Sequence, residues 1–204
     1  MISADKALHK LKEGNRRFVG VTSTRGVLET HLDHIRVVRE QKPFAIILGC
    51  SDSRVPAELV FHCGLGELFV IRVAGNLVAP SQIGSIEYAC QQFDTELVVV
   101  MGHSNCGAIR VTVDALLAED RPVSPNLKSI VERIAPAVAP AVSNHSDASH
   151  DELIGIAVNA NIQHSVRRLS EKSMILRNLV EAGRLKIVGA EYSLDTGEVV
   201  FLDD

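Results

Sequence analysis

The sequence predicts an α/β fold: a central, mostly parallel β-sheet flanked by helices, with an N-terminal helical arm and a C-terminal strand pair. Three short apolar runs rich in β-branched residues occupy residues 44–48 (FAIIL), 68–73 (LFVIRV) and 96–101 (ELVVVM). Continuous apolar strands that alternate with helices are typical of a parallel sheet covered on both faces. A chain of 204 residues is long enough for one core. We expect a single domain, 1–204, with a helical arm (1–42) and an α/β core (43–204).

The arm contains helical patterns and no strand pattern. Ser3 suits an N-cap, and the apolar residues that follow recur at helical spacing: Ala7, Leu8 and Leu11. This pattern predicts a helix that ends near Gly14. Residues 32–41 (LDHIRVVREQ) predict a second short helix before Pro43. We expect both helices to pack outside the main sheet.

Helices are also expected between and after the strands of the core. Residues 83–93 read as a helix, and further helices are predicted from residue 108 and from Ser124. A long helical stretch starts near residue 152, restarts near Ser173 and stops at Gly183. One of its faces is apolar: Ile154, Val158, Ile162, Val166 and Leu169. Residues 184–194 and 197–203 then predict a terminal strand pair around the turn DTG.

The composition excludes several classes of partner. The formal net charge is −4, which gives no electrostatic reason to expect nucleic acid or an anionic membrane as a partner. No apolar run approaches the roughly 20 residues that span a bilayer. The opening residues lack the continuous apolar stretch of a signal peptide. We therefore expect a cytoplasmic protein, in which the four cysteines are reduced thiols or metal ligands.

Chemically active residues follow two of the predicted strands. The run GCSDSR places Cys50, Asp52 and Arg54 on one face if the chain stays extended, and GHSNC places His103 and Cys106 after the third strand. Ligands bind at the carboxyl ends of parallel strands in open α/β sheets. Two thiolates and an imidazole are good zinc ligands, and they leave a fourth position for water. The residues alone leave unrelated packing as the alternative.

Four segments in order resemble the β-class carbonic anhydrases of bacterial type: CSDSRVPAEL, GELFVIRVAGN, GSIEYA and GHSNCGA. The resemblance runs from about residue 5 to the C-terminus. It implies that Cys50, His103 and Cys106 hold one Zn²⁺ per subunit. Asp52 and Arg54 match the catalytic pair of the family, and in a closed state the aspartate becomes the fourth ligand.

The resemblance also implies substrate-binding residues and an assembly. Gln41 matches a glutamine that holds bicarbonate from the neighbouring subunit, and Phe69 and Tyr88 match aromatic residues of the substrate cleft. A core role is the alternative for these two rings. Gly107 matches a glycine whose backbone N–H contacts substrate. The expected assembly is a homodimer or homotetramer.

Two positions depart from the family pattern. Val73 stands where asparagine is common, so no polar role is expected there. Ile47 stands where members with a closed resting site carry tryptophan, which favours an open site with water on zinc.

The expected reaction is the reversible hydration of CO₂ to bicarbonate and a proton. Zinc lowers the pKa of its water, and the resulting hydroxide attacks CO₂. Asp52 would orient the hydroxide while Arg54 keeps Asp52 ionised and off the metal. Two alternatives remain: hydrolysis of carbonyl sulfide or carbon disulfide on the same scaffold, and a structural zinc in an interaction module.

Overall fold

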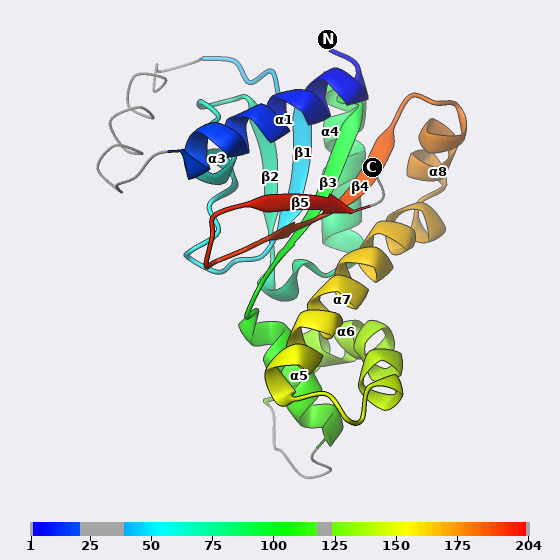
Figure 1. Cartoon of the computed structure of the whole chain (residues 1–204). Coiled ribbons are helices and arrows are strands. Elements are labelled where there is room, and N and C mark those ends of the chain that lie inside the picture. Colours follow the sequence, from blue (N-terminus) through cyan, green and yellow to red (C-terminus); the bar gives the residue numbers. More distant parts are fainter. Residues whose placement is uncertain (1, 21–38, 118–123, 203–204) are drawn as a thin grey trace.

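A five-stranded sheet forms the centre of the molecule in the computed structural model, which describes residues 2–20, 39–117 and 124–202 (Figure 1). The strands are β1 (Ala45–Gly49), β2 (Leu68–Arg72), β3 (Leu97–His103), β4 (Lys186–Tyr192) and β5 (Val199–Leu202). Their order is β2-β1-β3-β4-β5. All neighbours are parallel except β4 and β5, which are antiparallel. The predicted α/β class, the mostly parallel sheet and the C-terminal strand pair are confirmed.

Helices cover both faces of this sheet. The strand residues Ile46 and Leu48 point into a core formed with α4 (Pro80–Phe93), α5 (Gly107–Leu117), α6 (Pro125–Asn144), α7 (His150–Lys172) and α8 (Met174–Glu181). Ala45 and Ile47 point to the opposite face, where α1 (Ala4–Val19) and α3 (Ala57–Val60) pack. Successive strand residues face opposite sides, so β1 contributes to both cores and is buried throughout. This explains why its sequence is apolar without alternation.

The register between β1 and β3 sets the position of the residues that follow them. Gly49 lies opposite Met101 in the parallel pair. The carboxyl ends of both strands therefore reach the same edge of the sheet, just before Cys50 and at His103. In Figure 1, α5, α6 and the start of α7 gather beyond this edge. The short helix η1 (Ala74–Asn76), which follows β2, contacts the same group of helices.

The first helix is longer than the sequence predicts. It continues past Gly14 to Val19. A Cβ atom at Gly14 would lie 1.9 Å from the Phe61 backbone oxygen. The glycine therefore allows α1 to approach α3 closely, and it does not end the helix. The second predicted helix, 32–41, lies almost wholly outside the described residues.

Serine side chains cap the starts of three of the remaining helices, two of them at the predicted positions 124 and 173. Ser124 accepts a hydrogen bond from the Leu127 N–H at the start of α6, and Ser149 forms a capping box with Glu152 on α7. Ser173 separates α7 from α8 and caps the second of them. Across the described ranges, every helix is too short or too polar to cross a membrane.

Candidate metal centre

Three metal-ligating side chains meet at the carboxyl edge of the sheet. Cys50 directly follows β1, His103 ends β3, and Cys106 directly precedes α5. Their ligand atoms all lie within 4.8 Å of one another, and the two Sγ atoms are 3.9 Å apart. The structure thus brings together the three residues that the sequence singled out. The helix α5 begins at Gly107, one residue before the predicted start at residue 108.

The donor set fits a zinc ion. All three side chains are buried, with His103 completely so. The His103 ring places Nδ1 2.9 Å from the Ser104 carbonyl oxygen, while Nε2 has no hydrogen-bond partner among the described residues. A proton on Nδ1 is donated to that carbonyl, which leaves the Nε2 lone pair directed at the thiols. A buried, unpartnered nitrogen beside two thiols is the arrangement expected of a metal ligand.

The two thiols share one negative charge. A hydrogen bond from the Cys106 thiol lowers the pKa of Cys50 to about 4, against the opposing effect of burial. The same hydrogen bond, together with burial and the Cys50 charge, raises the pKa of Cys106. The backbone N–H groups of Ala108 and Ile109, at the start of α5, act in the opposite direction and favour the Cys106 thiolate. A bound cation would replace the shared proton and leave two thiolates.

The segment after β2 supports the Cys50 sulfur. The Gly75 N–H points at Cys50 Sγ over 3.4 Å, and Gly75 adopts a φ of 73°. Buried Asn161 on α7 donates to the Gly75 oxygen over 2.9 Å. A Cβ at Gly75 would meet Ile134 Cδ1 at 2.6 Å. The backbone therefore reaches the thiolate only because residue 75 is a glycine.

Asp52 and Arg54 form a bidentate pair next to the ligands. Arg54 Nε and its terminal nitrogen donate to the two Asp52 oxygens over 3.0 and 2.8 Å, and the Arg54 backbone N–H adds a third bond of 3.0 Å. Asp52 Oδ2 lies 3.9 Å from His103 Nε2. The Arg54 guanidinium holds the pKa of the Asp52 carboxyl well below its usual range. The carboxylate is therefore ionised and turned toward the arginine.

Sequence reasoning missed Arg72, the last residue of β2. Its Nε donates to the backbone oxygen of Cys50 over 2.9 Å, and a terminal nitrogen donates to the backbone oxygen of Asp52 over 2.5 Å. One guanidinium thus joins the backbone on both sides of residue 51 to the neighbouring strand. The sequence did contain one signal, which is the position of Arg72. It is close to the carboxyl end of a predicted parallel strand, and in the sheet it lies opposite Gly49, the last residue of β1.

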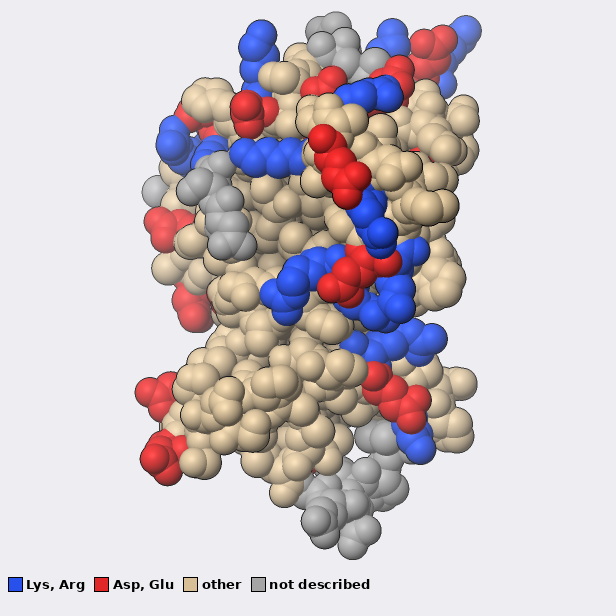
Figure 2. All heavy atoms as spheres, turned by 90° about the vertical axis from the view of Figure 1, so that its right-hand side faces the viewer, with Lys and Arg blue, Asp and Glu red and all other residues tan. Residues whose placement is uncertain are grey.

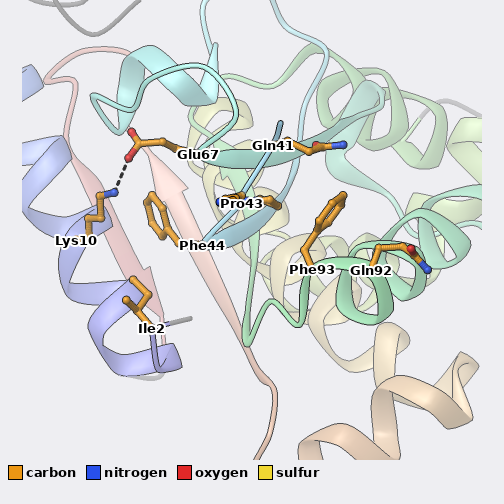
Figure 3. Close-up of a pocket in the computed structure, with 9 residues that line it drawn as sticks. Ile2, Lys10, Gln41, Pro43, Phe44, Glu67, Gln92 and Phe93 are labelled. Atoms are coloured by element: carbon orange, nitrogen blue, oxygen red, sulfur yellow. Dashed lines mark hydrogen bonds and ion pairs between the residues drawn. The ribbon is translucent and has the colours of Figure 1, made fainter. Parts of the chain in front are cut away.

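The four predicted substrate residues fall in different places. Gly107 begins α5 beside Cys106, and a Cβ there would meet no atom within 4 Å. Gln41 lies four residues before β1, at the opposite end of that strand from Cys50, and the strand alone spans roughly 16 Å. It lines a cavity of about 550 Å³ with Phe44, Phe93 and the Lys10–Glu67 ion pair (Figure 3).

The two predicted aromatic residues belong to one cluster. Phe69, near the start of β2, lies 6.1 Å from the Tyr88 ring and 6.1 Å from the Phe93 ring. Tyr88 is 50% exposed. Phe69 pairs with Ile46, at the amino end of β1, so the cluster lies away from the carboxyl edge that holds the ligands of the same chain. Within one chain, the structure does not bring Gln41 and these rings to the thiols.

The other two cysteines are structural. Burial raises the pKa of Cys63 to about 12 and that of Cys90 to about 11. The Cys63 thiol donates to the Phe61 oxygen over 3.3 Å. Neither belongs to the ligand group at the sheet edge.

Comparisons with known proteins agree with this geometry. A family model described as carbonic anhydrase matches residues 45–199. Carbonic anhydrase 2 of Mycobacterium tuberculosis (strain CDC 1551 / Oshkosh) is 36% identical over 195 residues, covering 95% of this chain and 90% of its own length. The carbonic anhydrase of Mycolicibacterium smegmatis is also 36% identical, with 93% and 88% covered.

A solved structure extends the likeness to the fold. The Coccomyxa β-carbonic anhydrase, determined in complex with acetazolamide, superposes with a TM-score of 0.72 at 26% identity, covering 96% of this chain and 86% of the other. Family match, relatives and fold agree with a Cys-His-Cys group at the sheet edge. The chain belongs to the β-class carbonic anhydrase family.

Proposed function

We propose that this protein catalyses the reversible hydration of CO₂ to bicarbonate and a proton. The observation that carries the proposal is the buried Cys50-His103-Cys106 group beside an ionised Asp52. Three protein ligands leave one position of a tetrahedral site for water, whereas structural zinc sites are closed by four protein ligands. This arrangement favours catalysis over a structural-zinc module.

Cys50, His103 and Cys106 would hold the zinc ion. When bound, zinc supplies the Lewis-acid activation of a water molecule for attack on CO₂. The Ser104 carbonyl orients the His103 ring, and the Gly75 N–H stabilises the Cys50 thiolate. These contacts hold the ligand atoms in place before the ion arrives.

We assign the orientation of the attacking oxygen to Asp52. An ionised carboxylate only accepts hydrogen bonds, so it would take one from the nucleophile and direct a lone pair at the carbon. Arg54 keeps this carboxylate charged and turned aside through two side-chain contacts. The pair supports an open resting site, in which Asp52 does not occupy the fourth position.

We further propose that a second copy of the chain completes the substrate cleft. Gly107 lies beside the ligands of its own chain, but Gln41, Phe69 and Tyr88 lie elsewhere on the surface. The half-exposed Tyr88 supports a contact with another copy. A homodimer is the smallest assembly that satisfies this arrangement, and a homotetramer can contain it twice.

We also propose one domain over residues 1–204 and a cytoplasmic location, where the thiols at the ligand positions stay reduced.

The proposal is tested by stopped-flow CO₂ hydration with the zinc-loaded protein, followed with a pH indicator. We expect kcat/KM in the range of efficient enzymes, at or above about 10⁴ M⁻¹ s⁻¹. Carbonyl sulfide and carbon disulfide serve as parallel substrates and should react far more slowly. A folded protein with one zinc per chain and no hydration from pH 6 to 9 would contradict the proposal and favour a structural ion.

A further inference from the structure

Two adjoining cavities lie along α7, away from the metal ligands. The smaller, about 160 Å³, lies between α6 and α7 and is lined by Val78, Glu132, Arg133, Pro136, His164, Ser165 and Arg168. The larger, about 420 Å³, lies between α4 and α7 and has a mostly apolar wall: Val78, Ala79, Pro80 and Ile83. Val78 and Arg168 line both cavities. The two cavities therefore adjoin at these two side chains, and together they are called the groove.

The groove is rich in cationic groups. Arg133 and Arg168 line the smaller cavity beside the His164 imidazole, and Lys172 lines the larger. His164, Arg168 and Lys172 are spaced at i, i+4 and i+8, which puts them on one side of α7. Figure 2 faces the side of the molecule that carries α7 and α8, and a group of Lys and Arg side chains, with acidic side chains among them, crosses its middle.

The acidic residues of the groove are engaged with other groups. Glu132 forms an ion pair with Lys128 over 3.8 Å, one turn earlier on α6. Glu87 accepts a hydrogen bond of 2.5 Å from Ser173. Within the described parts of the chain, Arg168 and Lys172 have no ion pair and no hydrogen-bond partner. A hydroxyl donor leaves the charge of the Glu87 carboxylate in place. Arg133, Arg168 and Lys172 nevertheless outnumber Glu132 and Glu87 in the lining, which gives the groove a net positive charge.

Arg168 points to a missing acceptor. It is partly buried, and a guanidinium removed from water without an acceptor is unfavourable. Ser165 also lines the smaller cavity and is only 2% exposed, so its hydroxyl is a second donor for a ligand bound there. A ligand that accepts hydrogen bonds from both side chains would satisfy the guanidinium.

The surroundings of the groove change the pKa of His164. Burial lowers the pKa of His164, and the neighbouring Arg168 and Arg167 lower it further. The imidazole thus remains neutral next to the guanidinium groups, where it can donate or accept a hydrogen bond. The charge of the groove favours an anionic ligand, and its apolar wall favours a ligand that also carries an apolar part.

We propose that this groove binds a small organic phosphate, with the phosphate between Arg133, Arg168 and Ser165 and its apolar part against Val78 and Ile83. Arginine matches phosphate oxygens in a bidentate manner, and a dianion suits several cations better than a singly charged carboxylate does. A cavity of about 420 Å³ lies within the size range of small-molecule sites. The site is separate from the metal centre, and none of its lining residues is a ligand candidate.

Isothermal titration calorimetry on the zinc-loaded protein tests this site with three probes: phenyl phosphate, inorganic phosphate and benzoate. We expect phenyl phosphate to bind most tightly, because it uses both the cations and the apolar wall. Arg168→Gln should weaken its affinity about tenfold or more, and Ser165→Ala about threefold. CO₂ hydration without the probe should be unchanged in both variants.

Arg16→Gln on α1 is the matched control, because it removes the same charge far from the groove and should leave the affinity unchanged. Circular dichroism melting verifies that each variant folds. Equal affinity of the wild type and Arg168→Gln would overturn the proposal, because the probe would then lie at the metal centre or bind as an adventitious additive only. Absence of binding at 10 mM phenyl phosphate, a value on the order of weak ligand affinities, would also overturn it. Equal affinity for phenyl phosphate and inorganic phosphate would refute the organic ligand.

Discussion

Arg54 donates three hydrogen bonds to the Asp52 carboxylate. Two come from side-chain nitrogens that lie 3.0 and 2.8 Å from the carboxylate oxygens, and the third comes from the Arg54 backbone N–H. The two residues are separated by one position in a turn, which the Val55 N–H closes by donating to the Asp52 backbone oxygen over 3.1 Å, so the contact is local and does not depend on the extended chain that the sequence suggested. It turns the carboxylate away from the ligand group, although Oδ2 stays 3.9 Å from His103 Nε2. Asp52 is thus charged, close to the metal position and held aside.

Asp52→Asn tests the role of this charge. The amide keeps the shape of the side chain but can donate as well as accept, and it loses the charge that Arg54 binds. We expect kcat for CO₂ hydration to fall about 100-fold or more, the range typical of a positioned acid–base group. Zinc content should remain near one per chain, because the three ligands are unchanged. Wild-type kcat with full zinc would exclude the assigned role.

Arg72→Gln tests the contact that joins the metal loop to β2. A glutamine cannot reach both the Cys50 and Asp52 carbonyl oxygens, so the loop should become less ordered around Asp52. We expect kcat to fall about tenfold with zinc retained, because small misplacements at a reacting centre are costly. Arg177→Gln is the control, since Arg177 also donates to two backbone carbonyls, on Ser170 and Glu171, far from the metal. Similar activity in both variants would show that Arg72 is dispensable.

Cys106→Ser tests the ligand set. A serine hydroxyl is a poor zinc ligand, and His103 Nε2 would then lack its metal while it stays buried. We expect zinc measured by elemental analysis to fall below about one tenth of the wild-type content, given the dependence of affinity on each ligand. Cys63→Ser replaces another buried thiol and should keep its zinc. Full zinc in Cys106→Ser would remove this residue from the ligand set.

Gly75→Ala tests the backbone approach to the Cys50 thiolate. The new Cβ would meet Ile134 at 2.6 Å, and a φ of 73° is strained for alanine. We expect a loss of about 1–3 kcal/mol in the free energy of unfolding and weaker zinc retention against a chelator. The control is Gly84→Ala on α4, where a Cβ meets nothing and alanine favours the helix. A Gly75→Ala variant as stable as Gly84→Ala, by urea unfolding, would contradict this account.

Much of the core could be predicted because its signals are local. The apolar runs at β1, β2 and β3 are short and uninterrupted, and the serines at positions 124 and 173 mark helix starts through contacts within one turn. Such contacts depend on neighbours a few residues away, so the sequence displays them directly.

Other features depend on residues distant in the chain. Gly14 looked like a helix end, but the Phe61 backbone, 47 positions later, makes it a contact point inside α1. Arg72 reaches the metal loop only because β2 pairs with β1. Asn161 supports Gly75 across 86 positions. No local pattern encodes these pairings, because they arise when separate elements pack.

The sequence by itself determined the α/β class, the order of the elements and the residues of the ligand group, since strand periodicity and motif spacing are properties of short segments. The tertiary structure decided how those residues act together. Strand register put Cys50 next to His103 and Cys106, a glycine at position 75 let the backbone reach the thiolate, and the length of β1 separated Gln41 from the ligands of its own chain. Each of these outcomes follows from the packing of elements in space, which fixes distances that the linear chain leaves open.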